Sequence, residues 1–194
     1  MCIGAVRRQL KTLHSFQIFY QKTFILLIHK HINCLQMVKE GDFIQVVNSN
    51  VLLRVLGKDD FEGWKVLWRM YLDFYETHLP EEVYEKTFER LLSKDITSQN
   101  AIVAMDSSKI VGLVHFIFHP HNWKIEDVCY LQDLCVLDTL RGQGIGRLLI
   151  EAVYDEADKR GVPTVYWLTQ DFNKAARLLY DKVATLTPFI KYNR

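Results

Sequence analysis

A glycine-rich segment between a predicted strand and a predicted helix carries the clearest chemical signal in this sequence. Residues 130–137 are largely apolar and predict a mostly buried strand, and apolar residues at helical spacing over residues 145–157 predict a helix. Between them, Gly142, Gly144 and Gly146 lack side chains that would keep a ligand away from the backbone. The free N–H groups and the positive dipole end of the following helix therefore predict a site for a phosphate-bearing cofactor.

The spacing of these glycines limits which cofactor the loop could bind. A dinucleotide fingerprint that starts at Gly142 would need glycine at position 147, where Arg147 stands, and a phosphate loop would need Gly-Lys there. The pattern present is R-x-x-G-x-G, formed by Arg141, Gly144 and Gly146. It resembles the acetyl-CoA pyrophosphate loop of the GNAT superfamily of N-acetyltransferases. A glycine-rich loop without a ligand is the alternative interpretation.

A second segment, from Asn173 to Tyr180, is similar to the family's N-x-x-A-x-x-x-Y signature. The resemblance implies that Asn173 and Ala176 contact the cofactor and that Tyr180 faces its sulfur. Because a phenol with a pKa near ~10 can give a proton to a departing thiolate, Tyr180 is the predicted general acid. The alternative is a helix tyrosine that only packs.

The resemblance also places the pantetheine arm of acetyl-CoA beside the central strand, where it would add like a further strand. A backbone N–H near Val136 would then stabilise the oxyanion. The complete set of cofactor contacts that the resemblance implies is Leu134, Cys135, Val136, Arg141, Gly142, Gln143, Gly144, Ile145, Gly146, Arg147, Asn173 and Ala176.

On the substrate side, the sequence looks like the diamine (spermidine/spermine and thialysine) acetyltransferase branch. That branch has a Tyr-Glu pair after the first helix, present here as Tyr75 and Glu76, and a Glu-Asp pair on the central strand. Here the second pair is Gln132 and Asp133, so one carboxylate has become an amide that cannot act as a base. We expect Asp133 and Glu76 to attract the cation, and deprotonation either through water or by selection of neutral amine.

Other reactive residue types have less specific patterns. His115, His119 and His121 lack a carboxylate or cysteine at partner spacing, so a metal site is not expected. Cys135 is interpreted as a small buried hydrophobe rather than as a covalent acetyl carrier. Trp68, Tyr71 and Tyr75 are expected to be mostly core, with a cation-binding wall as the alternative.

The charge distribution separates the chain into two parts. Residues 1–36 hold five basic residues and no acidic one, which leaves 19 basic and 23 acidic residues, a net charge of −4, in the remainder. A mildly acidic domain is a poor nucleic-acid binder, and the longest apolar run of the first part is too short to span a bilayer. We interpret residues 1–36 as a dispensable, non-native leader. A transit peptide or a membrane-surface helix is the alternative.

Periodicity predicts the order β-α-α-β-β-β-α-β-α-β. The strands are expected at 51–56, 101–105, 109–119, 130–137, 164–168 and 189–192, and the helices at 60–75, 81–92, 145–157 and 173–183. This is the order of the GNAT fold, an α/β fold with three layers in which helices cover both faces of a twisted, mixed sheet. Residues 51–194 are the predicted acetyltransferase domain.

The sequence thus predicts a cytoplasmic, metal-independent enzyme that moves the acetyl group of acetyl-CoA to a primary amine. The acceptor is expected to be a diamine or amino-acid-like small molecule, with direct transfer in a ternary complex. A protein-lysine acetyltransferase and a non-catalytic acyl-CoA-binding module are the alternatives. No nucleic-acid partner and no membrane span are expected, and a homodimer is left open.

Overall fold

The computed structural model describes residues 43–45 and 51–194; the predicted leader lies outside these residues. None of the described helices reaches the length and hydrophobicity that crossing a bilayer requires. The elements, in chain order, are β1 Phe43–Gln45, β2 Val51–Val55, the 3-10 turn η1 Lys58–Asp60, α2 Phe61–Phe74, α3 Glu81–Leu92, β3 Gln99–Asp106, β4 Lys109–His119, β5 Val128–Val136, η2 Asp138–Leu140, α4 Ile145–Lys159, β6 Val165–Tyr166 and α5 Lys174–Val183.

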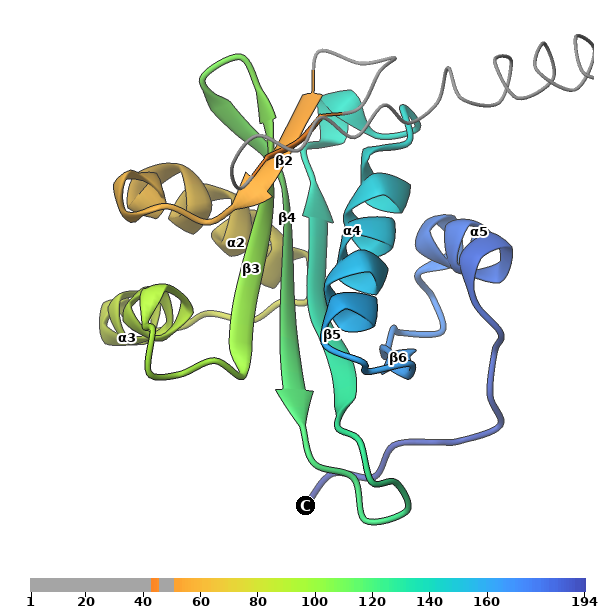
Figure 1. The fold of residues 1–194 in the computed structure, drawn as a ribbon. Helices are drawn as coiled ribbons and strands as arrows, with labels where there is room; N and C mark the ends of the chain where they lie inside the picture. Colours follow the sequence, from red (N-terminus) through yellow and green to blue (C-terminus); the bar gives the residue numbers. More distant parts are fainter. Residues whose placement is uncertain (1–42, 46–50) are drawn as a thin grey trace, which may run out of the picture.

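The described strands form one mixed sheet in the order β1-β2-β3-β4-β5-β6 (Figure 1). Neighbouring strands from β1 to β5 are antiparallel, while the short β6 pairs with β5 in parallel. Helices α2 and α3 lie on one side of the sheet and α4 lies on the other, which gives three layers (Figure 1). The predicted mixed sheet with helices on both faces is confirmed.

Each face of the sheet has its own apolar core. On the α2 and α3 side, Trp64 is fully buried and packs with Trp68, Tyr84 and Phe88. On the opposite side, the buried face of α4 packs through Ile145, Leu149 and Val153, among others. Because both faces are covered, β3, β4 and β5 read as nearly continuous apolar runs.

A bulge in β5 breaks the alternation of its side chains. His115 on β4 pairs with Asp133, but the next residue, Phe116, pairs with Leu131, so Gln132 is an extra residue without a partner. Before the bulge, Leu131 belongs to the α4 core; after it, Cys135 belongs to the α2 core. The bulge therefore turns the side chains that follow it toward the other face of the sheet.

Two of the predicted strands differ in the structure. The predicted strand at 189–192 is absent, and Phe189, Ile190 and Tyr192 are exposed, because this segment pairs with no described strand edge. The strand expected at 164–168 is limited to Val165–Tyr166. Just before α2, the Asp60 carboxylate accepts hydrogen bonds from Arg54 and from the Gly57 backbone N–H.

Candidate active site

The glycine loop leads directly into the first turn of α4. Gly144 precedes the helix with φ of 88° and Gly142 has φ of 77°, a left-handed region that disfavours residues with a Cβ. The first helical hydrogen bond runs from the Leu148 N–H to the Gly144 carbonyl, at 3.1 Å. The N–H groups before Leu148 in this turn thus have no partner within the helix, and no acidic side chain lies in the turn to compete for them.

Two arginines lie near this end of α4. Arg141 is held by Asp138 at 2.6 Å, and its Nε donates to the Val136 carbonyl at 3.3 Å. Arg147 lies 3.8 Å from Glu151, one turn further along α4. Both guanidinium groups are partly exposed, so they add positive charge to the helix dipole at the mouth of the site.

The edge of β5 is open beside this loop. Strand β6 pairs with β5 only at Cys129 and Tyr130, so the sheet splits beyond the bulge. Leu134, Cys135 and Val136 keep their partners on β4 but have none on the other edge among the described strands. Apart from the Val136 carbonyl, which accepts from Arg141, the backbone groups on this edge can pair with an extended ligand as an added strand.

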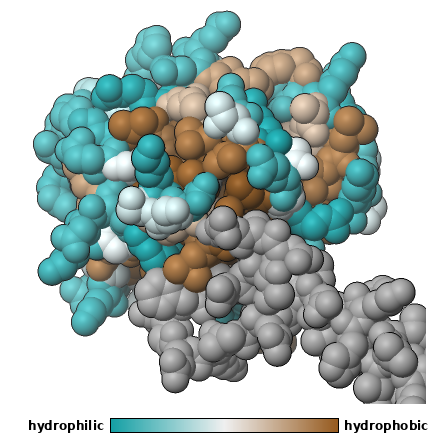
Figure 2. All heavy atoms as spheres, turned by 90° about the horizontal axis from the view of Figure 1, so that it is seen from above, coloured by the Kyte–Doolittle hydropathy of each residue, from teal (hydrophilic) through white to brown (hydrophobic). Residues whose placement is uncertain are grey.

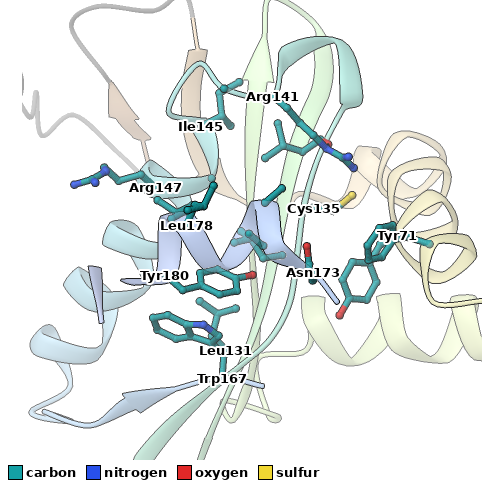
Figure 3. A pocket seen from close by; sticks show the side chains of 18 of the residues that line it. Tyr71, Leu131, Cys135, Arg141, Ile145, Arg147, Trp167, Asn173, Leu178 and Tyr180 are labelled. Atoms are coloured by element: carbon teal, nitrogen blue, oxygen red, sulfur yellow. The ribbon is translucent and has the colours of Figure 1, made fainter. Parts of the chain in front are cut away.

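The split in the sheet opens into a cavity of about 580 Å³ that α2, β5, α4 and α5 enclose. Arg141 and Arg147 belong to its lining, and Tyr180 and Tyr71 lie on opposite sides of it (Figure 3). The end of the molecule at which β5 finishes and α4 begins shows hydrophobic residues at its centre, bordered by hydrophilic ones (Figure 2). A ligand with an anionic part and an apolar part therefore suits this site.

Three phenol groups gather where α2 and α5 face each other. Tyr71 and Tyr75 stand one turn apart on α2 with ring centroids 5.0 Å apart, and the ring of Tyr180 packs edge-on against Trp167 at 5.3 Å. Burial, and secondarily the proximity of Tyr75, raise the pKa of Tyr180 to about 12. Burial, followed by the charge of Asp133, strongly raises the pKa of Tyr71. Tyr71 and Tyr180 are therefore protonated throughout the physiological pH range.

A buried chain of hydrogen bonds links Trp64, His115 and Asp133. The Trp64 indole Nε1–H lies 2.8 Å from His115 Nε2, and His115 Nδ1 lies 2.9 Å from an Asp133 carboxylate oxygen. Because an indole N–H can only donate, His115 Nε2 must accept, and its Nδ1 carries the proton that is donated to Asp133. Asp133, at the end of this chain, is only 7% exposed.

The structure brings most of the sequence-predicted site residues together. The cavity lining includes Tyr75, Gln132, Leu134, Cys135, Val136, Arg141, Gly142, Gly144, Ile145, Gly146, Arg147, Asn173, Ala176 and Tyr180. Gln143, Glu76 and Asp133 are absent from the lining. Glu76 follows α2 with φ of 52° and is exposed, whereas Asp133 is buried.

Sequence reasoning missed three aromatic residues of the cavity, Tyr71, Phe74 and Trp167. Tyr71 was expected to be mostly core and Trp167 to be part of a buried strand, but both line the cavity, whereas Trp68 is buried away from it. Tyr71 could have been found as the residue one helical turn before Tyr75. Trp167 lines the cavity because β6 ends one residue before it, at Tyr166. Nothing in the sequence indicates that the strand ends there.

The other candidate groups have structural partners. In the part of the chain that the structure describes, no three histidine, cysteine or acidic residues gather as a metal site would require. His115 bonds Asp133, and His119 Nε2 lies 3.0 Å from the Tyr166 hydroxyl. Burial raises the pKa of Cys135 to about 12, so this thiol is a poor nucleophile near neutral pH.

Comparison with known proteins identifies the family. The model of the acetyltransferase (GNAT) family matches residues 64–184, which include the glycine loop, the open edge of β5 and Tyr180. The chain belongs to the GNAT family of acetyltransferases. Its fold class and its dependence on acetyl-CoA, both predicted from the sequence, are therefore confirmed.

Two curated relatives match this chain over different lengths. The chain is 36% identical over 151 residues to the D-amino-acid N-acetyltransferase of Saccharomyces cerevisiae, which covers 77% of this chain and 94% of the relative. It is 35% identical over 71 residues to the thialysine N-epsilon-acetyltransferase of Bos taurus, which covers 37% of this chain and 41% of the relative. The predicted resemblance to the thialysine branch is thus found over a shorter region.

Solved structures agree on the fold. The aminoglycoside acetyltransferase AAC(6')-Iy in complex with a bisubstrate analogue superposes with a TM-score of 0.66 at 19% identity, over 75% of this chain and 98% of that chain. The ribosomal-protein-alanine N-acetyltransferase of Brucella melitensis gives a TM-score of 0.59 at 23% identity, over 74% and 98% of the two chains. At these identities the likeness concerns the fold alone.

Proposed function

We propose that this GNAT acetyltransferase transfers the acetyl group of acetyl-CoA directly to the primary amine of a small, amino-acid-like molecule, with D-amino acids as the leading class. The observation that carries the proposal is one continuous cavity that runs from the glycine loop to the three phenols of Tyr71, Tyr75 and Tyr180. The relative that matches over 94% of its own length is a D-amino-acid N-acetyltransferase, which supports this acceptor class.

The glycine loop, the β5 edge and α5 would hold the cofactor. Free N–H groups of the first turn of α4, with Arg141 and Arg147, would bind the pyrophosphate, because they combine hydrogen-bond donors with positive charge. The pantetheine arm would lie along Leu134, Cys135 and Val136, whose outer edge is open. Both features would direct the thioester toward the phenol end of the cavity.

At the thioester, the amine nitrogen would attack the carbonyl carbon and form a carbon–nitrogen bond. The backbone N–H near Val136 would stabilise the oxyanion, the nitrogen would lose its surplus proton to water, and the carbon–sulfur bond would then break. Tyr180 would give its proton to the departing sulfur. Since the pKa of Tyr180 is about 12 and that of a thiol near ~8.5, the proton should move only as charge develops on sulfur, with solvent restoring it afterwards.

The amine would enter beside Tyr71, Tyr75 and Gln132. A carboxylate at position 132 would favour polyamines, but Gln132 is neutral and exposed at the bulge. A neutral amide neither repels the carboxylate of an amino acid nor attracts a second ammonium group. This charge pattern suits an amino acid better than a long polyamine.

An amine screen tests the proposal. The full chain would be mixed with acetyl-CoA and, separately, with D-alanine, L-alanine, L-ornithine, thialysine, spermidine and a lysine-containing peptide, while free thiol is measured. We expect thiol release with at least one free amino acid and slower release with spermidine and the peptide. Rapid transfer to the peptide alone would favour protein lysines, and binding of acetyl-CoA without transfer to any amine would favour a non-catalytic module.

A further inference from the structure

Large apolar side chains line the cavity from two sides. Met70 and Phe74, one helical turn apart, line it from α2, and Leu168 lines it from the segment that follows β6. Phe74 is 46% exposed and Leu168 is 50% exposed. Both side chains therefore have apolar surface that a bound molecule can cover, and covering it favours binding.

This apolar surface adjoins the phenols rather than the glycine loop. The Phe74 ring packs edge-on against the Tyr75 ring, with centroids 4.9 Å apart. Leu168 follows Trp167, whose ring lies 5.3 Å from the Tyr180 ring. A molecule whose amine reaches the phenols can therefore place the rest of its structure against Phe74 and Leu168.

Phe172 extends the apolar surface beyond the cavity. Its ring lies 6.0 Å from the Phe74 ring, so it connects α2 with the segment between β6 and α5. Phe172 is exposed and is not a lining residue, although its neighbour Asn173 is one. It therefore lies at the rim, where exposed apolar side chains that gather together indicate a binding surface.

The charges of the lining disfavour a cationic side chain on the acceptor. Among the residues that the structure describes, the lining holds no aspartate or glutamate. A second ammonium group would lose hydration there without gaining a carboxylate partner. The Gln132 amide and the phenols can donate hydrogen bonds to the carboxylate that all amino acids share, so these groups do not distinguish one side chain from another.

We propose that Met70, Phe74 and Leu168 form a side-chain subsite, with Phe172 at its rim, that selects amino acids with a large apolar or aromatic side chain. This inference rests on the proposed function and narrows its acceptor class. The amine and the carboxylate are common to all candidate amino acids. Selection therefore comes from the apolar area that the side chain buries against the subsite.

A series of acceptors tests the subsite with the unchanged full chain. D-alanine, D-leucine, D-phenylalanine and D-ornithine would be compared by kcat/KM at saturating acetyl-CoA. We expect kcat/KM to rise from D-alanine to D-phenylalanine by roughly tenfold or more, the lower range for a single methylene in a hydrophobic pocket. D-ornithine should fall below D-leucine. Equal values across the series, or a preference for D-ornithine, would overturn the subsite.

A charge placed in the subsite should reverse part of this preference. Leu168→Asp adds a carboxylate, and Leu168→Asn is the control with the same shape and no charge. Relative to the Asn variant, the Asp variant should favour D-ornithine over D-leucine by roughly fivefold or more, because the carboxylate attracts the side-chain ammonium. Acetyl-CoA affinity should be equal in both. The same preference in the two variants would place the acceptor side chain elsewhere and overturn the subsite.

Phe74→Ala should reduce the preference for D-phenylalanine over D-alanine by roughly tenfold, because it removes apolar area that only the larger side chain covers. Phe189→Ala is the matched control, since this phenylalanine is exposed and lies outside the lining. The free energy of unfolding would be measured for both variants. A loss of activity that is equal for the two acceptors would show that Phe74 only supports the fold, which contradicts the subsite.

The acceptor series also separates this inference from the proposed function. Transfer to D-alanine at the same kcat/KM as to D-phenylalanine would overturn the subsite alone. If the unchanged chain acetylates none of the amino acids, the proposed function fails and the subsite fails with it.

Discussion

At the scale of single residues, Tyr180 is proposed to give its proton to the departing sulfur. Burial raises its pKa to about 12, so this phenol begins the reaction protonated near neutral pH. Tyr71, on the opposite side of the cavity, also has a raised pKa, chiefly through burial.

Tyr180→Phe should reduce kcat by roughly 10²–10⁴-fold while acetyl-CoA affinity stays nearly unchanged, because the variant lacks only the proton for the thiolate. Steady-state kinetics and calorimetric titration measure the two quantities. Tyr154→Phe is the control, since its hydroxyl donates to the Val183 carbonyl at 3.1 Å outside the cavity lining. Full turnover in the Tyr180 variant would show that this residue only packs.

Gln132→Glu should change acceptor preference in opposite directions for two substrates. One added negative charge is worth about 1 kcal/mol near a partly solvated site, so KM for spermidine should fall by roughly fivefold and KM for D-alanine should rise. Gln99→Glu adds the same charge on β3, outside the cavity lining. Equal effects of the two variants would mean that the amine binds elsewhere.

At the scale of elements, the cavity depends on two features of the backbone: the left-handed glycine turn before α4 and the split between β5 and β6. The turn could be predicted because its glycines follow a strand and precede a helical pattern. The split and the β5 bulge could not, because they arise from pairing between strands, such as His115 with Asp133 at a separation of 18 residues. Local patterns do not encode such register changes.

Gly144→Ala should raise the Kd for acetyl-CoA by about tenfold or more, an effect of about 1.4 kcal/mol, because the methyl group occupies space that the pyrophosphate needs. A Cβ at Gly144 meets no protein atom within 4 Å, so the space is open. Gly161→Ala is a matched control with φ of 68° and equally open surroundings, outside the cavity lining. Both variants should lose similar stability, and equal acetyl-CoA affinities would contradict the pyrophosphate loop.

Gly112→Ala should destabilise the fold by about 1–3 kcal/mol through overpacking. A Cβ there would lie 3.0 Å from both Ala104 and Leu149 and 3.1 Å from Ile145, where α4 crosses the sheet. Denaturant unfolding measures the change. Gly63→Ala is the control, because the atom nearest to the added Cβ is the flexible tip of the Ile110 side chain, at 3.2 Å. Alanine also favours a helix more than glycine does, so the free energy of unfolding should stay the same or increase. Equal stability of both variants would mean that α4 has room to move.

At the scale of the whole molecule, the order of elements from β2 to α5 agrees with the sequence prediction because each follows from its own hydrophobic period. The exception is the segment at 189–192, whose apolar residues suggested a strand although no strand edge accompanies it in the structure. Strand formation depends on a partner as well as on composition. The same reasoning explains why the site residues on local motifs, Arg141, Gly144 and Tyr180, were predictable while the buried pair of His115 and Asp133 was not.

The most direct measurement of the central claim is the stoichiometry of acetyl transfer. The full chain would be mixed with acetyl-CoA first alone and then with D-alanine, while free CoA, N-acetyl-alanine and the intact protein are followed by mass spectrometry. Direct transfer in a ternary complex predicts no CoA release and no acetylated protein before the amine is added, and one N-acetyl-alanine per CoA afterwards. An acetylated protein formed before the amine is added, or CoA release without acetylated amine, would contradict it.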